Sequence, residues 1–406
     1  MRNEGYLLFL GAGRWQCYGI KCARQLGIRT IAVDANPDAI GFDHSDKVIN
    51  IDFHKNEDSV ITALEKYNFY LRGVISYCNE KGMRLASKIR GMYGLAGIDE
   101  KITENMVNKY HQRKKWTKHN LPCPKWKLIE SLVLDIKKID DGLSYPLIIK
   151  PIDSSGSRGV IKINERDELS TGLTYAQKFS ADGRLIIEEY FDGDEYTVES
   201  ITINNVTTIL TVTKKAKVLN TQNTVANQLE SINTHDELYL ILSKLAINAL
   251  SALGYDNGPG HTEILHNKVT NKIILVETAG RGAGFKVFES LVPKVSGYNF
   301  TNATLFQAIK EKFEAPVQIS NNYGIIKYFT GKKGTVVSIK GFEKIKNFHN
   351  NKISIEGSPF VNLGEKLETP STDGDRLGYL MGWGKRRSDV FDIFIDHFEK
   401  ISFEIQ

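Results

Sequence analysis

The stretch "YPLIIKPIDSSGSRGVIKI", residues 145–163, contains two apolar runs separated by a loop rich in serine and glycine. Lys150 stands at the end of the first run, before the loop. In a phosphate-binding P-loop the lysine instead follows the glycines and opens a helix. Because both flanking runs are rich in β-branched residues, the stretch predicts a strand, a flexible loop and a second strand. We therefore expect a hairpin with a mobile flap.

Length and composition describe an ordinary globular protein. At roughly 150 residues per domain, the 406 residues predict two to four domains, and the chain is 41% hydrophobic and 25% charged. The 53 basic and 48 acidic residues nearly balance, which argues against a nucleic-acid partner. The four cysteines form no C-x-x-C pair, which favours reduced thiols over disulfides or a metal knuckle. With no signal peptide and no membrane-length apolar run, a cytoplasmic protein without a membrane partner is expected.

The N-terminal part alternates strand and helix patterns. Strands are expected at 6–11, 28–35 and 73–78, and helices at 16–26 and 60–67. This β-α-β-α-β order predicts a parallel, doubly wound sheet.

The first turn of this sheet reads "GAGRWQ", and the second strand ends at Asp34. A dinucleotide-binding turn has a glycine where this chain has Gln16. NAD binding is therefore a weaker interpretation than a tight strand-to-helix turn.

The rest of the chain is predicted to be mixed. Residues 103–119 are basic and helix-compatible and end before the prolines of "NLPCP", which indicate a linker. Within a strand-rich region, 236–253 is predicted as a helix. The last ninety or so residues read as short β segments closed by an amphipathic helix at 388–400.

Carboxylates gather on two predicted hairpins. The segment "RLIIEEYFDGDEYTVE" places Glu188, Glu189 and Glu195 around a strand, a turn and a second strand. In "GHTEILHNKVTNKIILVETAGRGAG", Glu263 lies on the first arm of a hairpin and Glu277 on the second, and a glycine-rich turn carrying an arginine follows. Two carboxylates on adjacent strands can hold a hard cation such as Mg²⁺ together with phosphate oxygens.

Lys109 and Lys150 precede these carboxylates and can neutralise phosphate, while backbone N–H groups of the Ser154–Gly159 loop can cradle its oxygens. Together, the lysines, the loop and the acidic hairpins are suited to phosphoryl transfer from a nucleoside triphosphate.

The order and spacing of these motifs resemble the ATP-grasp superfamily, most closely its carboxylate-amine ligases. The resemblance spans nearly the whole chain, from "LGAGRWQ" and "VDANP" through "NKYHQRKKW", "YPLIIKP", "SSGSRGV", "EEYFDGDEYTVE" and "HTEI" to "VETAGRGAG". It implies a mixed α/β and α+β fold: a Rossmann-like pre-ATP-grasp domain, then a two-lobed ATP-grasp fold with a C-terminal β-rich portion. The implied boundaries are 1–98, a linker helix at 99–124, a lid at 125–192, a core with the metal site at 193–310, and the β-rich part at 311–406.

The resemblance also implies roles for individual residues. Lys109 and Lys150 would contact phosphate, Glu263 and Glu277 would hold Mg²⁺ or Mn²⁺, and Arg281 would act with Lys150 in catalysis by facing the acyl phosphate. The remaining ATP-binding residues by this resemblance are Ser154, Ser155, Gly156, Ser157 and Gly159 for phosphate, Glu188 for the adenine amino group, Glu189 and Phe191 for the adenine edge, Glu195 for ribose, and Lys214 or Lys215 for a further phosphate contact.

The expected function is an ATP-dependent ligase that joins a small carboxylate to an amine through an acyl phosphate. The acceptor pocket is expected near 217–228 and 285–288, and a homodimer is compatible with the resemblance. One departure is Ala279, which stands where the family motif has a metal-binding asparagine. The alternatives are a ligase like phosphoribosylglycinamide synthetase and a nucleotide-binding protein without turnover.

Two other site types are less well supported. The "GSRG" segment lacks the first glycine of a G-x-S-x-G nucleophile elbow, because Ser155 stands there. His261 and His266 flank Glu263 but form neither an H-E-x-x-H motif nor a set with cysteine, so a zinc site is disfavoured.

Overall fold

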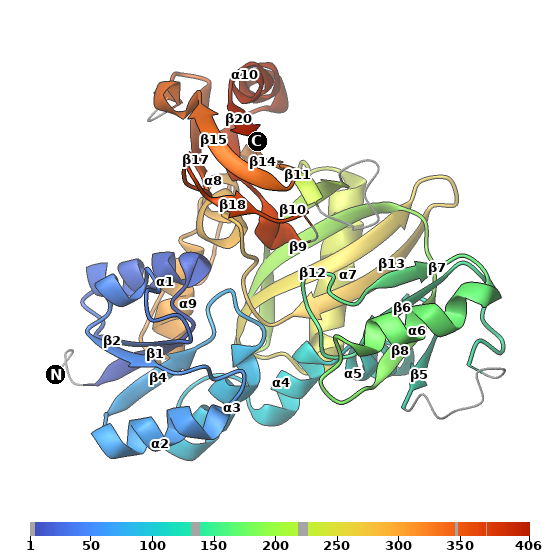
Figure 1. The fold of residues 1–406 in the computed structure, drawn as a ribbon, viewed down its shortest axis with the longest axis horizontal. Helices are drawn as coiled ribbons and strands as arrows, with labels where there is room; N and C mark the ends of the chain where they lie inside the picture. Colours follow the sequence, from blue (N-terminus) through green and yellow to red (C-terminus); the bar gives the residue numbers. More distant parts are fainter. Residues whose placement is uncertain (1–4, 131–138, 218–225, 346–347, 371) are drawn as a thin grey trace.

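The structure, a computed structural model, describes residues 5–130, 139–217, 226–345, 348–370 and 372–406 (Figure 1). It is a mixed α/β fold with several sheets, as predicted.

The N-terminal sheet is fully parallel, with the strand order β3-β2-β1-β4. Its elements are β1 (Tyr6–Leu10), α1 (Arg14–Gln25), β2 (Thr30–Asp34), β3 (Lys47–Asn50), α2 (Glu57–Tyr67), β4 (Leu71–Ile75) and α3 (Gly82–Tyr93). The predicted doubly wound arrangement is confirmed, because apolar strand residues such as Leu8 and Ile31 are fully buried between helices. The Asp34 carboxylate accepts from the backbone N–H of Ala12 at 2.7 Å, so it fastens the glycine turn itself.

A second, four-stranded sheet has the order β5-β8-β6-β7, and α6 packs on it. Its elements are β5 (Trp126–Ile129), β6 (Leu147–Pro151), β7 (Ile161–Ile163), α6 (Leu169–Gln177) and β8 (Leu185–Glu189). β6 and β7 are antiparallel, with Leu147 opposite Ile163. The hairpin predicted from the opening stretch is confirmed, and its loop connects the ends of these two strands.

The largest sheet has nine strands in the order β13-β12-β9-β10-β11-β14-β19-β17-β16. Those strands are β9 (Asp194–Ile203), β10 (Val206–Lys217), β11 (Ala226–Ser231), β12 (Gly258–Asn267), β13 (Lys272–Ala279), β14 (Tyr323–Phe329), β16 (Phe348–His349), β17 (Ile353–Pro359) and β19 (Gly378–Gly384). The predicted helix at 236–253 is α7 (Glu237–Leu253), whose residues Leu242 and Leu250 are buried.

The C-terminal region is rich in short strands, as predicted. A small sheet of β15 (Gly334–Lys340), β18 (Lys366–Leu367) and β20 (Ser402–Ile405) lies beside α10 (Arg387–Glu399), close to the predicted helix at 388–400. Figure 1 shows this region projecting from one end of the large sheet, away from the four-stranded sheet.

Two segments differ from the sequence-based expectation. The predicted helix at 103–119 is two helices, α4 (Glu100–Val107) and α5 (Lys109–Lys118), because Asn108 adopts extended backbone and its side chain caps α5 by accepting from two backbone N–H groups. The second is a helical segment after β13 that the sequence did not predict. It consists of the short π-helix η4 (Val287–Leu291), α8 (Val292–Ser296) and α9 (Phe300–Ala308).

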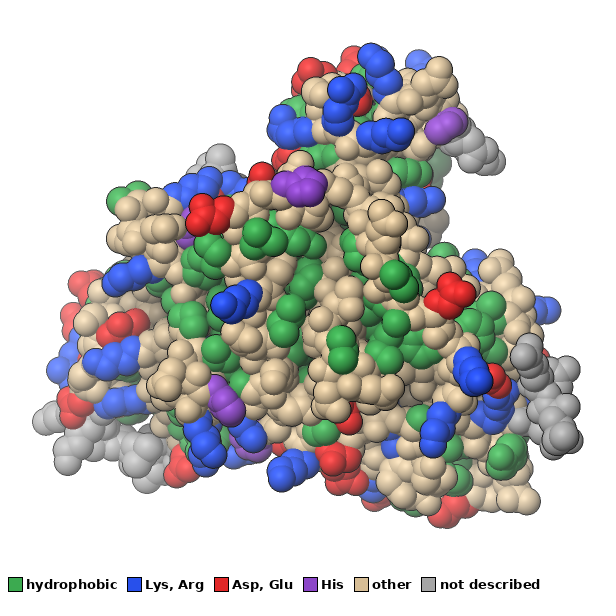
Figure 2. Space-filling view, turned by 180° about the vertical axis from the view of Figure 1, so that it is seen from behind, with side chains coloured by type: hydrophobic (Ala, Val, Ile, Leu, Met, Phe, Trp, Pro, Cys, Tyr) green, Lys and Arg blue, Asp and Glu red, His purple; other side chains and the backbone are tan. Residues whose placement is uncertain are grey.

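β8 and β9 are consecutive in sequence but belong to different sheets. The short link between them, residues 190–193, therefore joins the four-stranded sheet to the large one (Figure 1). From behind, Figure 2 shows apolar side chains over the middle of the molecule. On α7, Leu240 and Ile241 are exposed. Among the described helices, none is both long and apolar enough to span a bilayer.

Candidate functional site

Lys109 is the first residue of α5 and links three parts of the fold. Its Nζ lies 2.9 Å from Glu277 Oε1 on β13 and 2.5 Å from the carbonyl oxygen of Ser154 in the hairpin loop. Its backbone N–H donates to the carbonyl of Ile152 at 2.8 Å. Burial alone would lower the pKa of Lys109, but the carboxylates of Glu277 and Glu80 raise it, so the lysine is charged.

Lys150 lies at the end of β6 and is buried with a carboxylate from the neighbouring strand. Its Nζ is 2.6 Å from Glu188 Oε2, and Arg113 of α5 donates to the other oxygen of Glu188. All three side chains are almost fully buried. Burial would raise the pKa of Glu188, but Arg113 and Lys150 beside it lower that pKa to about 2. The structure thus gives the Glu188 carboxylate two cationic partners, and no ligand is needed to satisfy it.

Glu263 and Glu277 are direct cross-strand partners on β12 and β13. Side chains of such a pair point to the same face of the sheet and lie close together. Lys215 of β10 binds Glu263 at 2.9 Å and also pairs with Glu195 of β9. Lys215 therefore brings Glu195 and Glu263, from the two acidic segments, together, and the role of Glu263 and Glu277 as metal ligands stays a prediction.

Lys214 and Lys215 face opposite sides of β10, because successive side chains of a strand alternate. Lys214 is partly exposed and pairs with Asp194 at 2.9 Å. Lys215 is the one that reaches Glu195 and Glu263. Of the two lysines considered from the sequence, the structure brings only Lys215 to the acidic cluster.

The hairpin loop has the conformation expected of a glycine-rich flap. Gly156, Ser157 and Gly159 all have positive φ, at 66°, 59° and 74°. Gly156 and Ser157 are exposed, whereas Gly159 is buried. The loop therefore turns sharply and presents Ser154, Ser155 and the following backbone beside Lys109.

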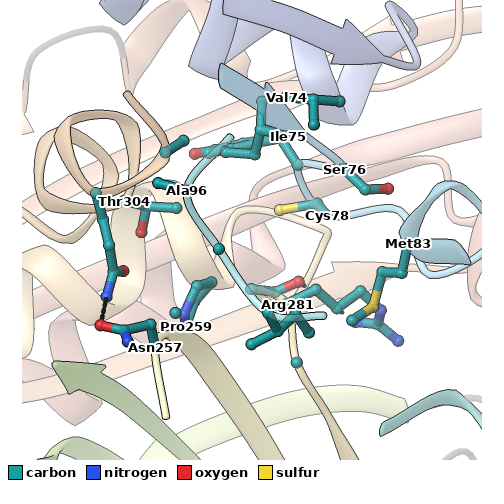
Figure 3. Close-up of a pocket in the computed structure, with 18 of the residues that line it drawn as sticks. Val74, Ile75, Ser76, Cys78, Met83, Ala96, Asn257, Pro259, Arg281 and Thr304 are labelled. Carbon is teal, nitrogen blue, oxygen red and sulfur yellow. Dashed lines mark hydrogen bonds between the residues drawn. The ribbon is translucent and has the colours of Figure 1, made fainter. Parts of the chain in front are cut away.

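Arg281 follows β13 and reaches the loop between β4 and α3 of the N-terminal part. Its guanidinium donates to Glu80 at 2.9 Å, across 201 residues of sequence. Burial would lower the pKa of Arg281, but Glu80 raises it. Arg281 also borders a cavity of about 70 Å³ between the N-terminal sheet and the turn after β13, lined mainly by apolar groups (Figure 3). Figure 3 shows Cys78 and Met83 near Arg281, and Thr304 on the far side.

The remaining predicted residues lie around this centre. Glu189 accepts from the backbone N–H of Ser144 at 3.0 Å, and the half-buried Phe191 belongs to the link between the two sheets.

No cluster of three or more histidine, cysteine or acidic side chains able to hold a metal occurs in the described part of the chain. His266 bonds Asn271, and His261 pairs with Glu199 and also lies 3.6 Å from Glu263. Residues 218–225, most of the expected acceptor loop, lie outside the described residues.

Three residues of the site were missed from the sequence: Arg113, Gln112 and Glu80. Gln112 bonds both the carbonyl and the N–H of Thr278, fixing α5 against β13. Lys109 and Arg113 are four residues apart on a helix and therefore share a face. This spacing could have predicted from the sequence that Arg113 lies beside Lys109. Glu80 gave no such signal, because its partner is remote in sequence.

Comparisons with known proteins agree with this architecture. The family described as an ATP-grasp domain matches residues 143–289. D-alanine–D-alanine ligase of Ruthia magnifica subsp. Calyptogena magnifica is 30% identical over 104 residues, covering 25% of this chain and 33% of that one. The chain spans between 18% and 62% of the length of the first curated relatives it matches. Residues 143–289 are therefore similar to an ATP-grasp domain.

Solved structures resemble the whole chain. L-amino acid ligase from Bacillus licheniformis superposes with a TM-score of 0.82 at 19% identity, covering 100% of both chains. The biotin carboxylase domain of Hydrogenobacter thermophilus 2-oxoglutarate carboxylase, solved with MgADP, gives a TM-score of 0.78 at 15% identity and covers 99% of this chain and 91% of that one. At these identities the likeness shows the fold, which is the mixed α/β fold expected from the sequence, and the domain boundaries stay a prediction.

Proposed function

We propose that the protein is an ATP-dependent ligase that joins a small carboxylate to an amine. The observation that carries the proposal is the position of Lys109, whose ammonium touches both the glycine-rich loop and the carboxylate of Glu277. A cation placed between a flexible backbone cradle and a cross-strand pair of carboxylates suits the triphosphate of a nucleotide.

In the proposed reaction a carboxylate oxygen attacks the γ-phosphorus of ATP, ADP leaves, and an acyl phosphate forms. The amine then attacks the acyl carbon, loses a proton, and releases phosphate. Lys109 and Lys150 would neutralise charge on the phosphates, so that catalysis is mainly positioning and electrostatics. Closure of the Ser154–Gly159 loop would keep water from the acyl phosphate.

Glu263 and Glu277 fit a Mg²⁺ ion by the chemistry of their donors. Mg²⁺ is usually bound in such sites by one or two carboxylates together with substrate phosphates. When bound, the ion would neutralise charge on the transferred phosphoryl group. Lys215 and Lys109 already hold the two carboxylates in place on their shared face of the sheet.

Arg281 would orient the acyl phosphate and then stabilise the oxyanion formed when the amine attacks. The cavity beside it, at about 70 Å³, is about half the 150 Å³ of an engineered cavity that binds benzene. We therefore propose that the carboxylate substrate carries a small apolar side chain, with its carboxyl group toward Arg281.

The test is the release of ADP on mixing the protein with ATP, Mg²⁺ and pairs of amino acids. We expect ADP formation that depends on both a carboxylate and an amine, and trapping of the acyl phosphate by hydroxylamine. Wild-type turnover by Lys150→Ala or Glu277→Gln would contradict the assigned site.

A buried Ala279 in place of a metal-binding asparagine favours a second candidate, a nucleotide-binding protein without turnover. Thermal stabilisation by ATP and Mg²⁺ with no ADP across the panel would support that candidate.

A further inference from the structure

A second cavity, of about 550 Å³, lies apart from Arg281 and shares no lining residue with the cavity beside it. Its walls come from α1, from η4 and α8, and from β17 and β19, which meet where the N-terminal layer approaches the C-terminal strands (Figure 1). The residues that line this cavity include Tyr18, Lys286, Glu289, Lys294, Glu356 and Tyr379. The mechanism proposed above uses none of them.

Two of these charged groups neutralise each other. Glu289 is almost fully buried and pairs with Lys286 of the preceding turn. Burial raises the pKa of Glu289, and Lys286 opposes that rise. This pair leaves Glu356 and Lys294 as the charges available to an occupant.

Glu356 is fixed in position and has no ion-pair partner among the described residues. Its Oε1 accepts from the hydroxyl of Ser290 at 2.6 Å and from that of Tyr379 at 3.3 Å. Both partners are neutral hydroxyls, so no ion pair among the described residues neutralises this carboxylate. A ligand ammonium would supply the missing charge.

Lys294 is the matching cation. Its Nζ lies 4.6 Å from the centre of the Trp383 ring, and no carboxylate in the described part of the chain pairs with it. Packing on an aromatic ring holds the ammonium in place and leaves N–H groups for an anion. The cavity therefore presents one fixed anion and one fixed cation, with the rings of Tyr18 and Tyr379 beside them.

The backbone here is strained. Phe285 and Lys286 are consecutive non-glycine residues with φ of 56° and 70°, and a π-helix follows them. Such conformations are costly for bulky residues and are found mainly at ligand and switch sites. The segment from Arg281 to Lys286 thus joins the proposed catalytic centre to the wall of the second cavity.

We propose that this cavity binds a small zwitterion, a free α-amino acid or a short peptide. The ammonium of the ligand is held by Glu356 and its carboxylate by Lys294. The site is separate from the ATP-grasp centre, and its binding does not require the proposed ligase activity.

The experiment is calorimetric titration of the full chain, without nucleotide, with a set of amino acids and dipeptides. The N-acetylated and amidated forms of each compound, which lack one of the two charges, are titrated in parallel. Glu356→Gln keeps the acceptor oxygen for Ser290 and Tyr379, and Lys294→Met keeps the aliphatic stem. We expect each variant to weaken binding about tenfold or more, as loss of a charged hydrogen bond does.

The matched controls are Glu65→Gln, an exposed carboxylate on α2, and Glu277→Gln, which disables the proposed metal site. Both should bind the zwitterion like the wild type. The proposal is overturned if no zwitterion binds in the millimolar range, if blocked forms bind equally well, or if Glu356→Gln and Lys294→Met leave affinity unchanged. Equal loss in Glu277→Gln would place the binding in the catalytic centre and would also overturn it.

Discussion

Glu263 and Glu277 lie directly opposite each other on β12 and β13, and each carboxylate is held by a lysine from a different element. Lys215 of β10 binds Glu263 and Lys109 of α5 binds Glu277, each at 2.9 Å. The pair therefore stands between two cations, and this arrangement underlies the proposed grip on a nucleotide triphosphate.

Lys215→Met should reduce ADP formation at least tenfold. The substitution removes the buried cation that Glu195 and Glu263 share, and loss of a buried ion-pair partner is costly. Glu195 keeps Lys217 at 2.8 Å, whereas Glu263 keeps only His261 at 3.6 Å. Lys214→Met is the matched control on the same strand, because Lys214 lies on the other face and pairs with Asp194. The measurement is steady-state kcat/KM for ATP in the two variants. An equal decrease in both would show that the face of β10 that carries Lys215 is not the functional one.

Glu188→Ala should destabilise the protein by about 3–5 kcal/mol, because the buried cations of Arg113 and Lys150 lose their carboxylate partner. Urea unfolding followed by fluorescence measures the change. Asp396→Ala, which removes the exposed partner of Lys400, is the control and should leave the unfolding midpoint unchanged. A midpoint for Glu188→Ala equal to that of the control would contradict the buried network.

Stability should decrease in acid through the same carboxylate. The pKa of Glu188 is lowered from an ordinary value of 4.5 to about 2 in the folded protein. Ionised Glu188 therefore stabilises the fold fully above pH 4.5, and this contribution is lost as the pH falls toward 2. Glu188→Gln should flatten the dependence of the urea midpoint on pH over that range, whereas Glu65→Gln should keep it. An unchanged slope in Glu188→Gln would refute the assignment.

Gly159→Ala should raise the KM for ATP about tenfold, because a methyl group at this position would overpack the base of the loop. A Cβ there would lie 2.8 Å from the Cβ of Phe179 and 2.9 Å from Pro151. Gly156→Ala is the control: its φ is also positive, at 66°, but nothing lies within 4 Å of its Cβ. Gly156→Ala should therefore lower the stability of the folded protein by only about 1 kcal/mol, through backbone strain. Similar KM values for both variants would mean that loop packing does not affect nucleotide binding.

The sequence predicted those parts of the fold that depend on local pattern. Alternation of strand and helix periods predicted the N-terminal parallel sheet, and β-branched runs around a serine and glycine loop predicted the β6–β7 hairpin. The break at Asn108 was not predicted, because Lys109 and the residues after it continue a helix-compatible pattern. The assignment of β8 and β9 to different sheets depends on tertiary pairing, which no local pattern encodes.

The spacing of motifs in the sequence predicted which types of residue form the site, but not which individual side chains face it. Lys214 and Lys215 are adjacent and chemically identical, so only the register of β10 against β9 decides which one faces Glu195. Arg113 was hidden in a run of basic residues that resembles a solvated face, yet it is fully buried. Glu80 and Arg281 are 201 residues apart in sequence, so their contact could be found only in the three-dimensional structure.

The most direct test of the central claim is a crystal structure with a non-hydrolysable ATP analogue and Mg²⁺. We predict that the γ-phosphate lies between Lys109 and the Ser154–Gly159 loop, and that Glu263 and Glu277 hold the metal. The proposed nucleotide site would be contradicted if the analogue bound elsewhere. It would also be contradicted if the space between the four-stranded sheet and β12–β13 stayed vacant at saturating analogue.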